Sequence, residues 1–388
     1  MIPRLLAKKM QQASRQFPIV SLMGPRQSGK TTLVKSLFPR AAYVSFEDPD
    51  IRRNAAADLR GFLSSYKKML IIDEVQRIPE VFSYIQAIVD ERRKNGQFIF
   101  TGSQNYLLHE KISQSLAGRV AILRLLPLSL SELLLADKKI ISPDIILQKG
   151  FYPALWKQRT DTALFYSSYI NTYLERDVRQ IQNISSLTLF QNFIRLCAGR
   201  AGQILNLTSL GNDCGISHNT AKAWLSVLES SFIIHLLQPF YENYNKRIVK
   251  SPKLYFYDSG LLCHLLDISQ PKQLQQHYMK GALMENFIFA ELVKQAYNQG
   301  QPAGLYYWRD KTGNEVDFLL SGSGYKKLIE VKAGKTINPD FFRGIDYFRK
   351  IYKGKSRIKA SLIYGGENEY NYKQTQILNW RHATDAAR

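Results

Sequence analysis

A glycine-rich loop near the N-terminus constrains the fold of this chain more than any other segment. It fits the pattern G-x-x-x-x-G-K-[ST], with an apolar segment at residues 19–23 before it and a helix-forming segment after it. In such a strand–loop–helix unit, backbone N–H groups and the positive end of the helix surround a polyphosphate. We expect Lys30 to reach the β- and γ-phosphates and Thr31 to hold Mg²⁺. The predicted nucleotide-binding residues are Gly24, Pro25, Arg26, Gln27, Ser28, Gly29, Lys30, Thr31 and Thr32.

An acidic pair at the end of a second apolar segment extends this hypothesis. Leu70, Ile71 and Ile72 lead directly into Asp73 and Glu74. Hydrolysis of a nucleotide requires a carboxylate for the metal ion and a base for the attacking water. We therefore expect Asp73 to hold Mg²⁺ and Glu74 to polarise the water. The alternative is a strand that ends in a solvated acidic turn, which is a common pattern where no phosphate loop precedes it.

Two later segments carry polar residues that are candidates for contact with the γ-phosphate. The apolar segment 98–101 is followed by Ser103 and Gln104, either of which could sense that phosphate and position the water. Arg119 is a candidate arginine finger, acting in cis or from a neighbouring subunit of a homo-oligomer, because a guanidinium stabilises the charge of phosphoryl transfer. The alternative for Arg119 is an ordinary surface arginine.

The composition favours a polyanionic partner. The chain has 388 residues, enough for two or three domains, and a net charge of +21. Such an excess favours nucleic acid or an anionic membrane surface, and we expect DNA because the charge clusters beside the elements described below. The alternative is a chain that is simply basic. No apolar run approaches the roughly 18 residues of a membrane span. No signal peptide is recognisable and the three cysteines are scattered, so we expect a cytoplasmic location and reduced thiols.

Short apolar segments alternate with helical segments across residues 1–135. This rhythm predicts an α/β fold with a parallel sheet and helices on both faces. The predicted strands are residues 19–23, 42–46, 69–73, 98–101 and 121–125. Residues 136–200 are predicted to be a helical lid or linker, with aromatic residues along one side of a helix: Phe165, Tyr166, Tyr169 and Tyr173.

Together these motifs resemble those of the AAA-type P-loop NTPases. More specifically, they are similar to those of a widespread prokaryotic family of predicted ATPases with a conserved, uncharacterised C-terminal domain. The segments that carry the resemblance are GPRQSGKTTL, LIIDEVQRIPE, FTGSQNYLL, SLAGRV, LPLSLSE, YLERDV, SPKLYFYDSGLL, GALMENFIFAEL, YYWRDKTGNEVDFLL and IEVKAG. The resemblance covers nearly the whole chain and implies ATP binding and hydrolysis. It leaves the physiological role open, because that of the family is poorly defined.

Residues 201–270 have the pattern of a winged helix-turn-helix. A short helix is predicted to end near Cys214, Gly215 supplies the turn, and Ser217 can cap a second helix. Two apolar strands on either side of a basic turn would form the wing. Such modules contact phosphates through the second helix and the wing. The predicted DNA-contacting residues are His218, Asn219, Lys222, Lys246 and Arg247. A module that only packs, or that binds protein, is the alternative.

Residues 271–378 carry a nuclease-like constellation. Asp317 and Glu330-x-Lys332 lie on predicted neighbouring strands, and residues i and i+2 of a strand share a face. With Glu285 from a preceding helix, these carboxylates would hold Mg²⁺, and Lys332 would stabilise charge or orient the water. The quartet resembles the PD-(D/E)XK nuclease fold, with Val316 where the motif has proline. The alternatives are a surface Glu–Lys pair, or an inert nuclease fold that binds DNA without cutting it.

These predictions combine into one hypothesis with three variants. We expect an Mg²⁺-dependent AAA-type ATPase core at 1–135, a winged-helix module at 201–270, a nuclease-like α/β domain at 271–378 and a loose tail at 379–388. In the first variant the protein cuts DNA under the control of ATP. In the second it is an ATP-switched DNA-binding or regulatory protein whose nuclease fold is inert. In the third it is an ATPase that acts on protein partners.

Overall fold

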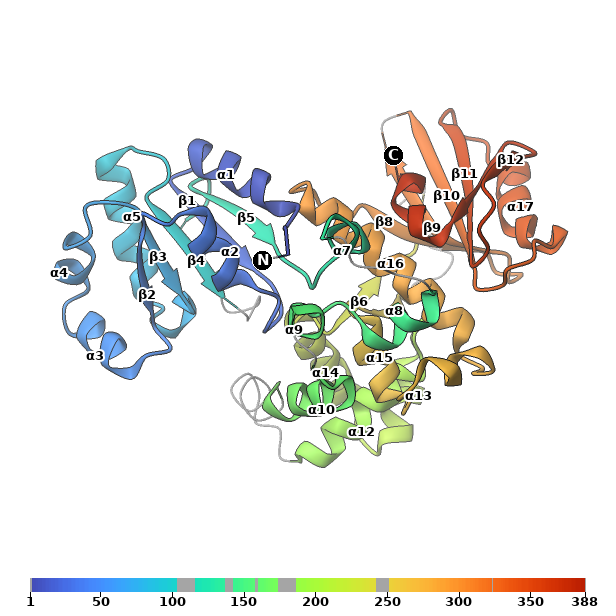
Figure 1. Ribbon diagram of the computed structural model, residues 1–388, viewed down its shortest axis with the longest axis horizontal. Coiled ribbons are helices and arrows are strands. Elements are labelled where there is room, and N and C mark those ends of the chain that lie inside the picture. The colour runs from blue at the N-terminus through green and yellow to red at the C-terminus, as the bar shows by residue number, and fades with distance from the viewer. Residues whose placement is uncertain are drawn as a thin grey trace. The chain divides into compact units, whose positions relative to one another are not determined.

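The chain forms two compact units (Figure 1). The computed structural model describes residues 2–102, 116–136, 142–157, 160–173, 186–241, 251–322 and 324–387. The N-terminal unit comprises Met1–Leu128, Ser230–Phe232 and Ala296–Gln301. The C-terminal unit comprises Ser129–Glu229, Ile233–Gln295 and Pro302–Arg388.

The N-terminal unit is built on a five-stranded parallel sheet with the order β2-β3-β4-β1-β5, which confirms the predicted α/β fold. Its strands are β1 (Ile19–Met23), β2 (Ala42–Ser45), β3 (Leu70–Asp73), β4 (Phe98–Gly102) and β5 (Val120–Arg124). Its helices are α1 (Leu6–Gln16), α2 (Lys30–Leu37), α3 (Pro49–Ala57), α4 (Leu59–Ser64), the short 3-10 helix η1 (Val75–Arg77) and α5 (Val81–Arg92). Because all five strands are parallel, their carboxyl ends lie along one edge, where β1 and β3 end in the predicted site.

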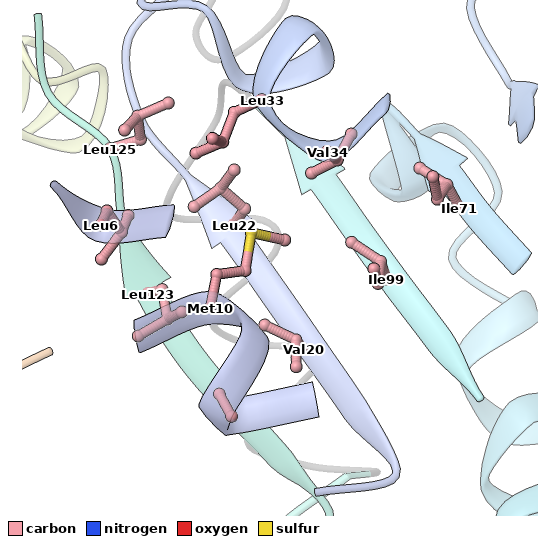
Figure 2. Close-up of a cluster of buried hydrophobic side chains, with 11 residues drawn as sticks. Leu6, Met10, Val20, Leu22, Leu33, Val34, Ile71, Ile99, Leu123 and Leu125 are labelled. Carbon is pink, nitrogen blue, oxygen red and sulfur yellow. The ribbon is translucent and has the colours of Figure 1, made fainter. Parts of the chain in front are cut away.

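Apolar side chains cover both faces of this sheet. Successive residues of a strand point to opposite faces. On one face, Val20 and Leu22 of β1 pack with α1 and α2 in a buried cluster (Figure 2). On the other face, the ring of Phe100 of β4 meets that of Phe82 of α5 edge to face, with centroids 5.8 Å apart. Full burial of such a side chain contributes roughly 1.5–3 kcal/mol, so both helix layers help to hold the strand ends in place.

The C-terminal unit contains a helical part and two sheets. Its helices are α7 (Leu130–Leu135), α8 (Pro143–Lys149), α9 (Pro153–Lys157), α10 (Thr162–Tyr173), α12 (Leu187–Ala198), α13 (Leu207–Cys214), α14 (His218–Ser230), α15 (Ser259–Leu265), η3 (Pro271–Gln275), α16 (Lys280–Asn298), η4 (Pro339–Phe342), α17 (Arg343–Ile351) and η5 (Trp380–Ala387). The antiparallel hairpin consists of β6 (Ile234–Leu237) and β7 (Lys253–Phe256). The aromatic side predicted along α10 is buried.

The second sheet has six strands in the order β12-β13-β11-β10-β9-β8. Its strands are β8 (Leu305–Arg309), β9 (Glu315–Gly322), β10 (Tyr325–Lys332), β11 (Arg357–Tyr364), β12 (Tyr370–Tyr372) and β13 (Thr375–Asn379). It is mixed, because β11 runs parallel to both β10 and β13 whereas the other neighbours are antiparallel. Ile345 and Phe348 of α17 pack against apolar residues of β8, β9, β10 and β11.

The longest helix of the described residues is α16, with 19 residues. Its Asn286 side chain donates to the carbonyl of Phe256 at 3.0 Å and accepts from the N–H of the same residue at 2.7 Å. This two-way hydrogen bond holds α16 against β7. Neither α16 nor any other helix in the described part of the chain combines the length and the apolar character needed to cross a membrane.

The residues after 379 do not form the loose tail that we predicted. Residues 380–387 form η5, and Trp380 is only 1% exposed, with Ala383 and Ala386 also buried. Trp380 packs edge to face against Phe287 of α16, with ring centroids 6.2 Å apart. The prediction missed this because a few small apolar residues among polar ones show no clear period, while burial of a single tryptophan is enough to fix the segment.

Candidate functional site

The glycine-rich loop joins the end of β1 to the start of α2, as the pattern predicts. Gly24 has no room for a side chain, because a Cβ there would lie 2.1 Å from the carbonyl oxygen of Leu125. Gly29 precedes α2 with a φ of 93°, a left-handed conformation that residues with a side chain rarely adopt. Gln27 has a positive φ as well. Two glycines thus allow the loop to turn tightly between the strand and the helix.

Lys30 lies inside this loop at the first position of α2. It is 7% exposed, and its Nζ donates to the carbonyl oxygens of Gly24 and Pro25, both at 2.8 Å. The hydroxyl of Ser28 is buried in the same loop and makes no hydrogen bond within the described part of the chain. An ammonium group beside a helix N-terminus is suited to bind a phosphate.

Arg4 supports the loop from the N-terminal segment, and the sequence did not suggest this. Its Nη1 donates to the carbonyl oxygen of Ser28 and its Nη2 to that of Leu126, each at 2.6 Å. A single arginine before an amphipathic helix carries no pattern from which this contact could be predicted. It links the loop to the segment that follows β5.

Asp73 is the last residue of β3, and its carboxylate accepts hydrogen bonds from hydroxyl groups on three neighbouring elements. Thr31 of α2 donates to Oδ2 at 3.0 Å, and the Tyr43 hydroxyl of β2 donates to the same oxygen at 2.8 Å. Thr101 of β4 donates to Oδ1. Burial and the hydrogen bond to Asp73 raise the pKa of Tyr43, so the phenol stays protonated and donates. Because all three partners are neutral, the charge of the carboxylate is available to a cation.

A magnesium ion fits this position. Carboxylate and hydroxyl oxygens are ligands that Mg²⁺ accepts, usually together with water and phosphate oxygens. Asp73 and Thr31 supply these two groups beside the glycine-rich loop. Tyr43 and Thr101 were not among the predicted residues, and Thr101 lies opposite Asp73 in the pairing of β3 with β4. The predicted Ser103, and its alternative Gln104, lie outside the described residues.

Glu74 follows Asp73 at the carboxyl end of β3. Its backbone has a φ of 52°, a left-handed conformation that is uncommon for glutamate. Its Oε2 accepts a hydrogen bond from the Gln76 side chain at 2.6 Å. Strained backbone of this kind clusters at functional sites. Glu74 thus lies beside Asp73 at the end of β3, and its role as a base stays a prediction.

Arg119 lies at the other end of the sheet from the glycine-rich loop. Its carbonyl accepts the N–H of Ile19, the first residue of β1, whereas the loop follows Met23, the last. Its guanidinium pairs with Asp90 of α5, with Nε 2.6 Å from Oδ1 and Nη2 2.8 Å from Oδ2. The alternative of a finger acting in cis is therefore wrong, because the length of a strand separates the two groups. A finger acting in trans stays a prediction.

The helix pair α13–α14 has the turn that the sequence predicts. Gly215 has a φ of 71°, and the Ser217 hydroxyl accepts the N–H of Thr220 at 3.1 Å, which caps α14. Trp224 on the buried side of α14 packs between Phe190 and Phe193 of α12. The predicted DNA-contacting residues of α14 are all exposed: His218, Asn219 and Lys222. Lys246 and Arg247 lie outside the described residues, so the basic turn of the hairpin stays a prediction.

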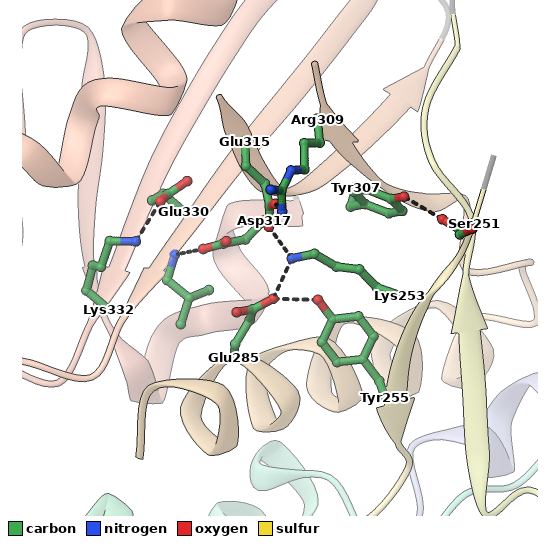
Figure 3. Close-up of polar contacts among 11 residues, drawn as sticks. Ser251, Lys253, Tyr255, Glu285, Tyr307, Arg309, Glu315, Asp317, Glu330 and Lys332 are labelled. Carbon is green, nitrogen blue, oxygen red and sulfur yellow. Dashed lines mark hydrogen bonds and ion pairs between the residues drawn. The ribbon is translucent and has the colours of Figure 1, made fainter. Parts of the chain in front are cut away.

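The nuclease-like quartet gathers where α16 meets β9 and β10 (Figure 3). Asp317 Oδ2 accepts the N–H of Val331 at 2.8 Å, which ties β9 to β10. Glu330 Oε1 lies 2.6 Å from the Nζ of Lys332, two residues along the same strand. The neighbouring charge of Asp317 acts on both Glu285 and Glu330. The structure thus brings the four predicted residues into one charged cluster.

A lysine that the sequence did not suggest enters this cluster from the hairpin. The Nζ of Lys253, on β7, lies 3.1 Å from Glu285 Oε1 and also contacts Glu315 on β9. The Tyr255 hydroxyl of the same strand donates to Glu285 Oε1. Lys253 belongs to the segment SPKLYFYDSGLL. In the sequence, a lysine at the start of a strand looks the same whether it is buried or lies at the surface, so its burial could not be predicted. Only the packing of β7 against α16 shows its role.

Burial changes the ionisation of this cluster. Burial and the charge of Asp317 raise the pKa of Glu285 to about 7 and that of Glu330 to about 8, although nearby lysines oppose the shift. Burial alone would lower the pKa of Lys253, but the carboxylates of Glu285, Asp317 and Glu315 raise it above its usual range. Lys253 therefore carries its positive charge among acids that resist ionisation.

The quartet does not fit the predicted magnesium site. Within the described ranges, no three His, Cys, Asp or Glu side chains are placed to share one metal ion. Glu285, Asp317 and Glu330 each have a protein partner, and a lysine supplies the positive charge that the prediction assigned to a metal. The sequence shows the spacing of carboxylates but not the cations that pack against them, so the predicted metal ion at this quartet stays a prediction.

Comparison with known proteins gives a family. Uncharacterized protein Rv2008c of Mycobacterium tuberculosis and Uncharacterized protein Mb2031c of Mycobacterium bovis are each 30% identical to this chain over 375 residues. Each alignment covers 96% of this chain and 82% of the relative. The chain belongs to their family. Neither relative's name states an activity.

Family models divide the chain into three parts. An AAA domain matches residues 16–134, and together with the parallel sheet it identifies an AAA-type P-loop domain. A domain of unknown function, DUF8612, matches residues 144–272, and another, DUF4143, matches residues 280–382. The Walker-type ATPase PABY2304 of Pyrococcus abyssi is 13% identical and covers 67% of this chain and 94% of its own, at a TM-score of 0.44, too low to add an argument. The winged-helix and nuclease-like assignments stay predictions.

Proposed function

We propose that this protein binds ATP at the glycine-rich loop and hydrolyses it with Mg²⁺. The observation that supports this most directly is the contact between Thr31 and Asp73, 3.0 Å apart beside the loop. The described partners of Asp73 are all hydroxyl groups, so its negative charge is uncompensated at the point where an ATPase needs a metal ion. The AAA-type family match supports the same function.

The residues would act in distinct roles. Lys30 would bind the β- and γ-phosphates, and Thr31 and Asp73 would hold the metal ion, which neutralises phosphate charge when it is bound. Glu74 would accept the proton of the attacking water. Thr101 would hold the Asp73 carboxylate in the orientation that the ion requires.

Measurement of ATP turnover by the full chain tests this proposal. We expect Lys30→Ala to lower turnover by at least about 100-fold, because it removes a charge that stabilises the transition state. Lys68→Ala, at an exposed lysine of the same unit, is the matched control and should leave turnover unchanged. Turnover that survives in Lys30→Ala would refute the assignment of the site.

We further propose that the ATPase acts on DNA through the C-terminal unit. The net charge of +21 supports a polyanionic partner, and the exposed His218, Asn219 and Lys222 of α14 support a contact with phosphates. ATP binding would set the arrangement of the C-terminal elements on DNA and hydrolysis would reset it. An ATPase that acts on protein partners is the other candidate, which the lack of salt-sensitive DNA binding would favour.

A salt titration of DNA binding separates these two candidates. Lys222→Ala should weaken binding to all duplex sequences alike and reduce the slope of log K against log salt by about 1. Lys272→Ala removes an exposed lysine from a different segment of the same unit and serves as the control. If Lys222→Ala binds like the unaltered protein, α14 is not the contact surface.

Of the cutting and non-cutting variants, the carboxylate cluster favours the second. Glu285 and Glu330 are paired with lysines, and in the described part of the chain no three acids are placed around one metal position. We expect no nicking of supercoiled DNA in the presence of Mg²⁺ and ATP. Nicking that disappears in Asp317→Ala would establish the cutting variant instead.

A further inference from the structure

Lys253 is buried inside the carboxylate cluster of the C-terminal unit. Its side chain is 3% exposed, and its ammonium group contacts Glu285 on α16 and Glu315 on β9. Tyr255 donates to the same Glu285 oxygen. Because residues i and i+2 of a strand share a face, β7 directs an ammonium and a hydroxyl group at one carboxylate (Figure 3).

The protein itself supplies nearly as many cations to this cluster as there are carboxyl groups in it. Its carboxylates are Glu285, Glu315, Asp317 and Glu330, and its cations are Lys253, Arg309 and Lys332. A buried charge that loses its partner is strongly destabilising. A divalent cation bound between Glu285 and Asp317 would meet the ammonium of Lys253, which contacts Glu285 and is acted on by the charge of Asp317. The cluster therefore disfavours a metal more than its acidic residues suggest.

We propose that Lys253 is the resident cation of this cluster and takes the place that a divalent metal would have in a nuclease site. The C-terminal unit then holds no catalytic metal between Glu285 and Asp317. The cluster instead anchors β7, and with it the hairpin that follows α14, to α16 and β9. This inference does not depend on the nucleotide reaction, so a failure of either proposal leaves the other standing.

Binding of Mn²⁺ to the nucleotide-free full chain, followed by electron paramagnetic resonance, tests the metal side of the proposal. We expect the unaltered protein and Asp317→Asn to bind the same number of ions with the same affinity, because no ion uses this carboxylate. A Mn²⁺ site that is present in the unaltered protein and lost in Asp317→Asn would overturn the proposal.

Thermal unfolding tests the anchoring role. Lys253→Met should lower Tm by about 10 °C, because it leaves buried acids without a cation. Lys311→Met, at an exposed lysine between β8 and β9, is the matched control and should not change Tm. Adding Glu285→Gln and Glu315→Gln to Lys253→Met should restore at least about half of the loss, because the uncompensated charges are then gone.

Three outcomes of the unfolding experiment contradict the proposal. An unchanged Tm in Lys253→Met would show that the ion pairs do not anchor the strand. A loss of Tm that the triple substitution does not restore would show that Lys253 acts by packing alone. If Lys253→Met does not fold, Lys253→Arg keeps the charge and should unfold within about 5 °C of the unaltered protein; a Lys253→Arg that also fails to fold argues for packing.

Discussion

Asp73 in the N-terminal unit and Glu285 in the C-terminal unit each accept a hydrogen bond from a tyrosine hydroxyl, that of Tyr43 or of Tyr255. They differ in their other partners. Besides Tyr43, the described partners of Asp73 are the hydroxyl groups of Thr31 and Thr101. Glu285 is instead paired with the ammonium of Lys253. Hydroxyl groups orient a carboxylate and leave its charge, while an ammonium group cancels that charge. The nature of the partner, more than the number of carboxylates, decides which of the two sites suits a metal ion.

The largest expected effect tests the uncompensated carboxylate. Asp73→Asn keeps the shape of the side chain and removes its charge, so kcat for ATP should fall by about 100-fold or more. Nucleotide affinity measured in EDTA should change less than about threefold, because Lys30 and the loop are untouched. A normal kcat in this variant would contradict the distinction between Asp73 and Glu285, because the charge of Asp73 would then not be needed to bind a metal ion.

A smaller loss is expected when one of the orienting hydroxyls is removed. Thr101→Val deletes a hydrogen bond to a charged group, and kcat/KM should fall by about tenfold. Ser64→Ala, which deletes an exposed hydroxyl of the same unit, is the control. If Thr101→Val is fully active, the hydroxyl groups around Asp73 are structural and do not position it for catalysis.

The carboxylate cluster of the C-terminal unit should make the thermal stability of the protein depend on pH. Burial and the charge of Asp317 raise the pKa of Glu330 from its ordinary 4.5 to about 8, so folding favours the protonated acid. Its contribution to stability is complete below pH 4.5 and is lost as pH rises towards 8. Glu330→Gln mimics the neutral acid, so its Tm should exceed that of the unaltered protein by about 3 °C at pH 8 and should match it near pH 4.5. A Tm difference that does not depend on pH would contradict this assignment.

The smallest effect is expected at an exposed ion pair. Arg119 and Asp90 face each other at the surface of the N-terminal unit, with the carboxylate side chain 48% exposed. Water already solvates both groups, so Asp90→Asn should leave Tm within about 1 °C of the unaltered value. Differential scanning calorimetry at low salt measures this difference. A large drop would show that burial is not what separates the strong ion pairs of this protein from the weak ones.

Much of the N-terminal unit could be predicted because its signals are local. The glycine-rich loop, the strand before it and the strand that ends in Asp73 are each a few residues long, and every predicted strand lies within one residue of its observed bounds. Thr101 was missed because it depends on which strands are neighbours, which the order of segments along the chain does not state. Arg119 was predicted to be an arginine finger from its motif alone. The parallel pairing of β1 with β5 puts it at the end of the sheet opposite to the glycine-rich loop.

The sequence by itself determined the phosphate loop, the parallel sheet around it and the presence of a nuclease-like quartet of three acids and a lysine near the C-terminus. All three follow from local spacing, because the period of a strand or the turn of a loop involves only neighbouring residues. Only the tertiary structure decided the electrostatic character of the two carboxylate sites. Lys253 comes from strand β7 to Glu285 on helix α16, more than thirty residues away along the chain. The free energy of a buried charge depends on such neighbours in space, which spacing along the sequence does not encode.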